Sequence, residues 1–115
     1  MLTISEEPDF IVVRAIGTLS KADYERFVPE FERIAQVRGR VAMLIDATKF
    51  EGWDLQGGWQ DLKFDAAHQH QLGPMAIIAE ERWKEWGTTL SKPFFSAEMH
   101  VFHPDEIEEA RRWLV

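Results

Sequence analysis

Residues 41–46 read VAMLID, five apolar side chains closed by a carboxylate, and residues 75–79 read MAIIA, a second apolar run of the same length. A short run that is apolar at every position is typical of a strand buried on both faces of a parallel sheet. Each run is followed by a segment in which apolar side chains recur at helical spacing, over residues 55–70 and 81–90. This alternation of strands and helices predicts an α/β domain.

The chain before the first apolar run predicts a hairpin and a long helix. Residues 1–5 and 10–18 are rich in β-branched and apolar side chains and are separated by a turn-like segment, which is typical of two antiparallel strands. Ser20 is the expected N-cap of a helix that ends at Gly39. Pro29 lies inside this helix, so we expect a bend or a break there.

The remaining segments complete a sheet of five strands. We expect a long loop over residues 47–54, an edge strand over residues 97–102 and a last helix that begins at Pro104. The predicted order is β-β-α-β-α-β-α-β-α. Because crossovers between parallel strands are right-handed, this order implies a mixed sheet with an N-terminal hairpin, in which the last four strands are parallel.

Size and composition indicate a single domain over residues 1–115, because 45% hydrophobic residues can supply one core. The sequence contains no cysteine, which excludes disulfide bonds and thiolate chemistry and agrees with a reducing compartment. Its start shows no basic segment followed by an apolar run, and no apolar stretch approaches the roughly 20 residues that span a bilayer. We therefore expect a cytoplasmic protein, either free in the cytoplasm or attached to the surface of a membrane.

The formal net charge of −7 restricts the partners of the protein. Binding of nucleic acid requires a stripe of lysine and arginine residues that neutralises phosphates, and the sequence shows none. The same charge repels anionic lipids, so any contact with a membrane would be hydrophobic rather than electrostatic.

Four of the five tryptophans lie between residues 53 and 86, in and beside the helices that follow the apolar strands. Aromatic walls with few polar groups are typical of sites for apolar ligands. We call these candidate residues the aromatic surface; they are Trp53, Leu55, Trp59, Leu62, Trp83, Trp86, Leu90, Phe94 and Phe95. Ordinary core packing is the alternative explanation for the same residues.

Polar candidates for a site are few. Asp46 follows an apolar strand at its carboxyl end, where α/β proteins place residues that contact ligands, so it is expected either to orient a polar head group or act as a base, or to accept hydrogen bonds from the next backbone segment. His68 and His70 point to different faces of a helix and cannot share a metal ion, and His103 is explained as a neighbour of a helix cap. The sequence therefore predicts no metal site, no cofactor and no catalytic motif.

Several short motifs, in order along the chain, resemble one protein family. They are LSKADY at 19–24, Pro29, LID at 44–46, FEGW at 50–53, WQDLKF at 59–64, AIIA at 76–79, PFF at 93–95 and EARRWL at 109–114. Together they resemble the SpoIIAA-like family of small bacterial proteins, which shares its fold with STAS domains and more distantly with CRAL-TRIO lipid-carrier domains. The resemblance covers nearly the whole chain.

The resemblance implies a β/α superhelix with about four helices mainly on one face of the sheet, and binding of hydrophobic ligands or membranes through mobile amphipathic helices. Phosphorylated STAS switches carry an Asp-Ser-Ser-Gly-like motif after the third strand. At this place residues 53–57 read WDLQG and contain no hydroxyl group, so a serine phosphoswitch is not carried over.

The expected function is a non-catalytic binding module for a lipid-like or aromatic molecule, or for a membrane interface, that uses the aromatic surface with Asp46 near it. The alternative is a protein-interaction or regulatory domain that uses the same surface, in a homodimer or with another protein. An enzyme that uses Asp46 and a histidine is the third hypothesis.

Overall fold

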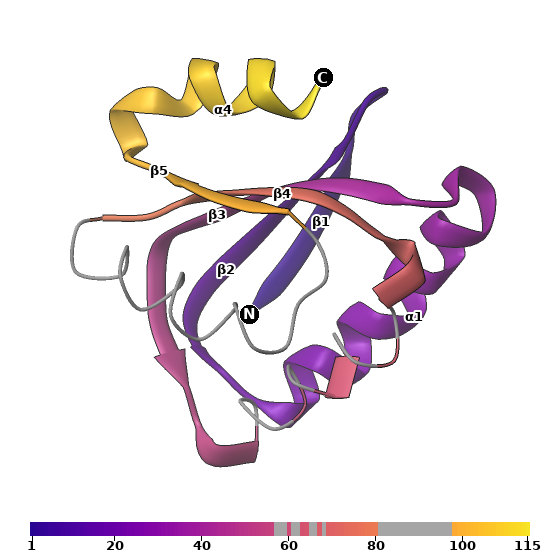
Figure 1. Ribbon diagram of the computed structural model, residues 1–115. Coiled ribbons are helices and arrows are strands. Elements are labelled where there is room, and N and C mark those ends of the chain that lie inside the picture. The colour runs from indigo at the N-terminus through magenta and orange to yellow at the C-terminus, as the bar shows by residue number, and fades with distance from the viewer. Residues whose placement is uncertain (57–59, 61–62, 65–66, 68, 81–97) are drawn as a thin grey trace.

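The computed structural model describes residues 1–56, 60, 63–64, 67, 69–80 and 98–115. Within these residues the core of the fold is a five-stranded sheet (Figure 1), whose strands are β1 (Leu2–Glu6), β2 (Ile11–Leu19), β3 (Val41–Trp53), β4 (Leu72–Ile78) and β5 (Met99–Phe102). The strands lie in the order of the sequence, β1-β2-β3-β4-β5. Strand β1 is antiparallel to β2, and every other neighbouring pair is parallel. The predicted mixed sheet is therefore confirmed.

Two α-helices, rather than about four, have bounds within the described residues: α1 (Lys21–Arg38) and α4 (Ile107–Leu114). Two short 3-10 turns accompany them, η1 (Gln69–Gln71) and η2 (Pro104–Glu106). The described residues of the second predicted helix, 55–56, 60, 63–64 and 67, are helical, and the third predicted helix over 81–90 lies outside the described residues.

The described helices cover opposite faces of the sheet, as Figure 1 shows for α1 and α4. Helix α4 thus lies apart from α1, and the prediction that the helices lie mainly on one face stays a prediction, because the helix predicted over residues 81–90 lies outside the described residues. The separation of α1 and α4 follows from the strands, because β2, β3 and β4 bury apolar side chains on both faces and each face requires a cover.

Alternate side chains of the strands build two separate cores. The core beneath α1 comprises Ile11, Val13, Phe27, Phe31, Ile34, Ala35, Val41, Met43, Phe64, Leu72 and Met75. The core beneath α4 comprises Phe10, Val12, Leu44, Ala76, Ile78, Phe102, Ala110 and Leu114. The N-terminal hairpin contributes to both, since Ile11 and Val12 are neighbours that point in opposite directions.

Strand β3 is longer than predicted and replaces the expected loop over residues 47–54. Its second half pairs with β2, where Gly17 lies opposite Phe50 and Leu19 opposite Trp53. Ala47 and Phe50 are buried in a third cluster with Leu19. Pairing and burial thus keep this polar-looking stretch extended as far as Trp53.

We expected a bend or a break at Pro29; helix α1 runs through Pro29 without a break, and the bend stays a prediction. Its ends agree with the prediction, with Ser20 as N-cap and Gly39 as C-cap. A proline inside a helix costs about 3 kcal/mol. Burial of Phe27 and Phe31 on either side of Pro29 contributes about 1.5 to 3 kcal/mol each, which offsets that cost.

Candidate functional site

Three of the ten predicted site residues, Asp46, Trp53 and Leu55, lie within the described part of the chain. The other seven lie outside it, and their place in a surface or in the core stays a prediction; they are Trp59, Leu62, Trp83, Trp86, Leu90, Phe94 and Phe95.

Trp53 is half-buried at the carboxyl end of β3, and two contacts fix its ring. The indole nitrogen Nε1 donates a hydrogen bond to the hydroxyl oxygen of Tyr24, at 2.8 Å. The ring also meets Phe50 edge-on, with 4.9 Å between the ring centroids. Tyr24 and Phe50 belong to α1 and β3, so Trp53 joins the first helix to the end of the third strand.

Leu55 follows Trp53 by two residues and is 93% exposed. It is the first helical residue after β3. The residues that follow Leu55 supply most of the predicted aromatic surface, and among the described ones Phe64 is buried in the core beneath α1.

Asp46 accepts local hydrogen bonds from the segment that follows it, which is the structural role expected as the alternative to ligand contact. Its Oδ1 atom accepts hydrogen bonds from the backbone nitrogen of Thr48, at 3.1 Å, and from the hydroxyl group of Thr48, at 2.7 Å. Such local bonds from an aspartate to the backbone two residues on are common where a strand is irregular. About 20 Å of extended chain separates Asp46 from Trp53 along β3, so the structure does not bring these two residues together.

In the described part of the chain, no three histidine, cysteine or carboxylate side chains form a group that could hold a metal ion. His103 was expected beside a helix cap and is itself the N-cap of η2, where its Nδ1 atom accepts a hydrogen bond from the backbone nitrogen of Asp105, at 3.3 Å. None of the described helices is both long and apolar enough to cross a bilayer.

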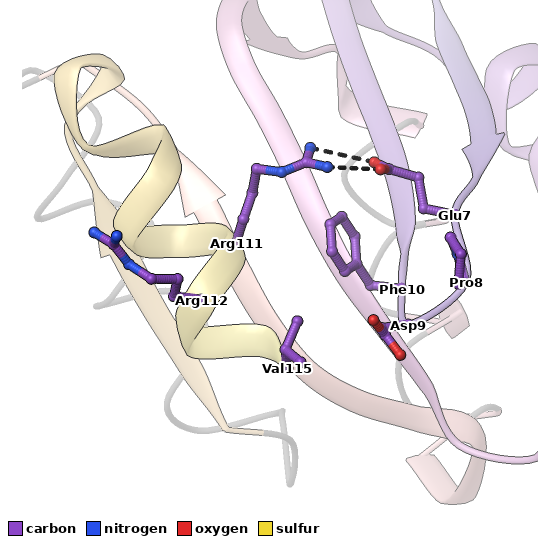
Figure 2. Close-up of a pocket in the computed structure, with 7 residues that line it drawn as sticks. All are labelled: Glu7, Pro8, Asp9, Phe10, Arg111, Arg112 and Val115. Carbon is purple, nitrogen blue, oxygen red and sulfur yellow. Dashed lines mark hydrogen bonds and ion pairs between the residues drawn. The ribbon is translucent and has the colours of Figure 1, made fainter.

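A hollow that the sequence did not predict lies between the β1–β2 turn and α4 (Figure 2). Its volume is about 490 Å³, and it is lined by Glu7, Pro8, Asp9, Phe10, Arg111, Arg112 and Val115. We call it the hairpin hollow.

One ion pair crosses the hairpin hollow. The guanidinium group of Arg111 donates to both carboxylate oxygens of Glu7, at 2.6 and 3.3 Å, and its Cζ atom lies 5.2 Å from the centroid of the Phe10 ring. The hydrogen bond to Glu7 raises the pKa of Arg111 above its ordinary value, although partial burial acts against the rise. The ion pair therefore favours the charged form of Arg111.

The sequence offered only a weak signal for this hollow. Acidic residues in the hairpin turn and arginines at the end of the last helix are both explained locally, by turn solvation and by the helix dipole. Their contact spans 104 positions of sequence and becomes visible only when the sheet order places α4 over the hairpin.

Known proteins resemble this chain in sequence and fold. The family model of SpoIIAA-like proteins matches residues 10–115. A crystal structure of an uncharacterized protein from Shewanella loihica PV-4, of the DUF3478 family and with a SpoIIAA-like fold, is 28% identical, with a TM-score of 0.83 over 100% of this chain and 93% of that one. No curated protein matches the chain.

The anti-sigma factor antagonist SpoIIAA in its unphosphorylated form is also similar, with a TM-score of 0.60 over 97% of this chain and 98% of that one. Its identity of 13% shows a shared fold alone. The resemblance seen in the short sequence motifs is confirmed by the family match and by both structures. Because the match extends over residues 10–115, the chain belongs to the SpoIIAA-like family.

Proposed function

We propose that this protein is a non-catalytic binding module, which takes up a hydrophobic or amphipathic, lipid-like molecule or contacts a membrane through the aromatic surface. The observation that carries the proposal is the 93% exposure of Leu55, two residues beyond the anchored Trp53. A single exposed leucine is common on proteins. This one begins the segment that holds most of the tryptophans of the chain.

The free energy available from such a surface is sufficient for a weak to moderate ligand. Removal of a large apolar side chain from water contributes about 1.5 to 3 kcal/mol. Three or four side chains that exchange water for a ligand therefore supply roughly 8 kcal/mol, which corresponds to a Kd near the micromolar range before the costs of ordering.

Trp53 supplies a rigid base for this surface, because Tyr24 and Phe50 hold its ring on the body of the domain. In the proposal, the helices predicted over residues 55–70 and 81–90 separate from this base to admit the ligand. The net charge of −7 favours apolar contacts over attraction to anionic head groups.

Tryptophan fluorescence tests the proposal directly. The protein is titrated with oleate and with vesicles of phosphatidylcholine, and acetate serves as a control that carries the carboxylate without the chain. We expect a saturable blue shift with oleate or with the vesicles, and none with acetate. An emission spectrum that stays the same with both oleate and vesicles contradicts the proposal.

The second candidate is a protein-interaction or regulatory domain without a serine phosphoswitch, acting as a homodimer or with another protein. The fold shared with SpoIIAA favours it, since that protein is named as the antagonist of an anti-sigma factor. Sedimentation distinguishes the two functions. A concentration-dependent dimer that dissociates in the Leu55→Glu variant, together with unchanged fluorescence in the lipid titrations, favours the interaction domain.

A further inference from the structure

The hairpin hollow lies at the opposite end of strands β2 and β3 from Trp53. Strands β2 and β3 are parallel, with Ile11 paired to Met43 and Leu19 paired to Trp53. Phe10 directly precedes β2 and lines the hollow, whereas Trp53 is the last residue of β3. The two places are therefore separate, and a ligand at one can be detected without the other.

The charges around the hollow leave one carboxylate unneutralised. Glu7 is paired with Arg111. Arg112 is exposed, and Figure 2 shows its side chain on the other side of α4 from Arg111. Asp9 is exposed, and among the residues that the structure describes its side chain has neither an ion pair nor a hydrogen bond.

The end of α4 adds further acceptors beside Asp9. Val115, the C-cap of α4, lines the hollow. The last carbonyl groups of a helix have no partner within the helix, and they form the negative end of its dipole. Asp9 and the end of α4 thus both favour a positive group at this position.

The rest of the lining suits a short apolar chain. Pro8, Phe10 and Val115 contribute apolar surface beside the charged groups. The hollow is an open depression of about 490 Å³, so a short chain in it stays partly exposed to water.

We propose that the hairpin hollow binds a small primary ammonium ion with a short apolar tail, with the ammonium group against Asp9 and the tail against Pro8 and Val115. A carboxylate in the same place meets the charge of Asp9 and is repelled. A neutral alcohol of equal length gains the apolar contact and loses the ion pair. The net charge of −7 also raises the local concentration of cations.

Amide NMR spectra recorded during a titration with hexylammonium chloride test this proposal, with sodium hexanoate and hexanol as matched ligands. We expect saturable shifts of the amide signals of Asp9, Phe10 and Val115 with hexylammonium, and no saturable shift with hexanoate. The amide of Leu55 is expected to stay in place, so a ligand at the aromatic surface is distinguished from one in the hollow.

Two variants and one control separate the ion pair from general charge. Asp9→Asn is expected to weaken hexylammonium binding by about two- to fivefold, because an ion pair at an exposed carboxylate is lost, and Asp9→Glu is expected to retain most of it. Glu30→Gln removes the same charge from an exposed position on α1 and is expected to leave the affinity unchanged. Shifts that do not saturate, equal binding of hexanoate, or an Asp9→Asn variant that binds like the parent protein each overturn the proposal.

Discussion

Arg111 binds Glu7 through both oxygens of its carboxylate and so joins the last helix to the turn of the first hairpin. The neighbouring residue, Glu6, faces the other helix, where Arg33 and Arg38 lie 3.5 and 3.4 Å from its carboxylate oxygens. Two adjacent carboxylates, at the end of β1 and in the turn after it, therefore contact helices that cover opposite faces of the sheet. The end of the first hairpin therefore links α1 to α4 through ion pairs. We call this link the joint.

A double-mutant cycle with Glu7→Gln and Arg111→Gln measures the strength of this joint. Both side chains are about a third exposed, at 30% and 38%, so solvent weakens the pair. We expect a coupling free energy of about 0.5 to 1 kcal/mol in urea unfolding, which decreases in high salt. The cycle of Glu6→Gln with Arg33→Gln is the control and is expected to give less. Equal coupling in the two cycles contradicts the special role of Arg111.

Asp23 is expected to make the stability depend on pH in the acid range. Burial by itself raises the pKa of this carboxyl group, but hydrogen bonds from the backbone and hydroxyl of Ser20 and the nearby Met1 ammonium lower the pKa below its ordinary value. The charged form therefore stabilises the fold above the unfolded pKa of about 4, and this stabilisation is lost as the pH falls through the lower folded-state pKa.

The Asp23→Asn variant checks this dependence by urea unfolding at several pH values. We expect it to lose about 1 to 2 kcal/mol at neutral pH and to show a flatter decline of stability below about pH 4. Glu30→Gln, at an exposed site on the same helix, is expected to follow the parent protein. A decline that is as steep in Asp23→Asn as in the parent protein excludes Asp23 as its source.

Gly73 allows β4 to approach β3 closely. A Cβ atom at this position would lie 2.9 Å from both the carbonyl carbon and the carbonyl oxygen of Val41, and this backbone is held in the sheet. We expect Gly73→Ala to cost about 2 to 3 kcal/mol in the free energy of unfolding. At Gly17 the space is open and only the positive φ of 71° opposes a side chain, so Gly17→Ala is expected to cost about 1 kcal/mol. A larger cost for Gly17→Ala than for Gly73→Ala would show that β3 and β4 move apart easily to accommodate a methyl group.

The hydrogen bond between Trp53 and Tyr24 is expected to hold the end of β3 against α1. Tyr24→Phe removes the acceptor and keeps the ring, and Trp53→Phe removes the donor and retains an aromatic side chain beside Phe50. We expect each change to cost about 1 kcal/mol or more, and the double variant to cost less than the sum. Additive costs in thermal or urea unfolding would mean that the bond contributes nothing.

The strands were predictable because their pattern is local. Two runs that are apolar at every position indicate central strands from the side chains alone, and residues 41–45 and 75–78 lie in β3 and β4 as expected. The extension of β3 to Trp53 was not predictable in the same way. Asp46, Thr48 and Lys49 interrupt the apolar pattern, and only the pairing with β2 keeps this stretch extended.

The face of the sheet that each helix covers depends on contacts between distant segments of the chain. The same is true of the hairpin hollow. Strands buried on both faces require cover on both, yet nothing in the pattern of α1 or α4 assigns either helix to a face. The pairs Trp53 with Tyr24 and Glu7 with Arg111 join residues 29 and 104 positions apart, and no spacing rule predicts them. The geometry of these contacts was therefore not predictable from the sequence, and the aromatic surface itself stays a prediction.

Fluorescence quenching by dibrominated stearate, free or within vesicles of phosphatidylcholine, tests the proposed binding function most directly, because bromine quenches only tryptophans that meet the acyl chain. Leu55→Glu places a charge on the aromatic surface, and Val37→Glu places the same charge at an 84% exposed position on α1 as the matched control. We predict strong quenching of the parent protein and of Val37→Glu, and much weaker quenching of Leu55→Glu. No quenching of the parent protein, or equal quenching of the two variants, would contradict a lipid-binding surface at Leu55.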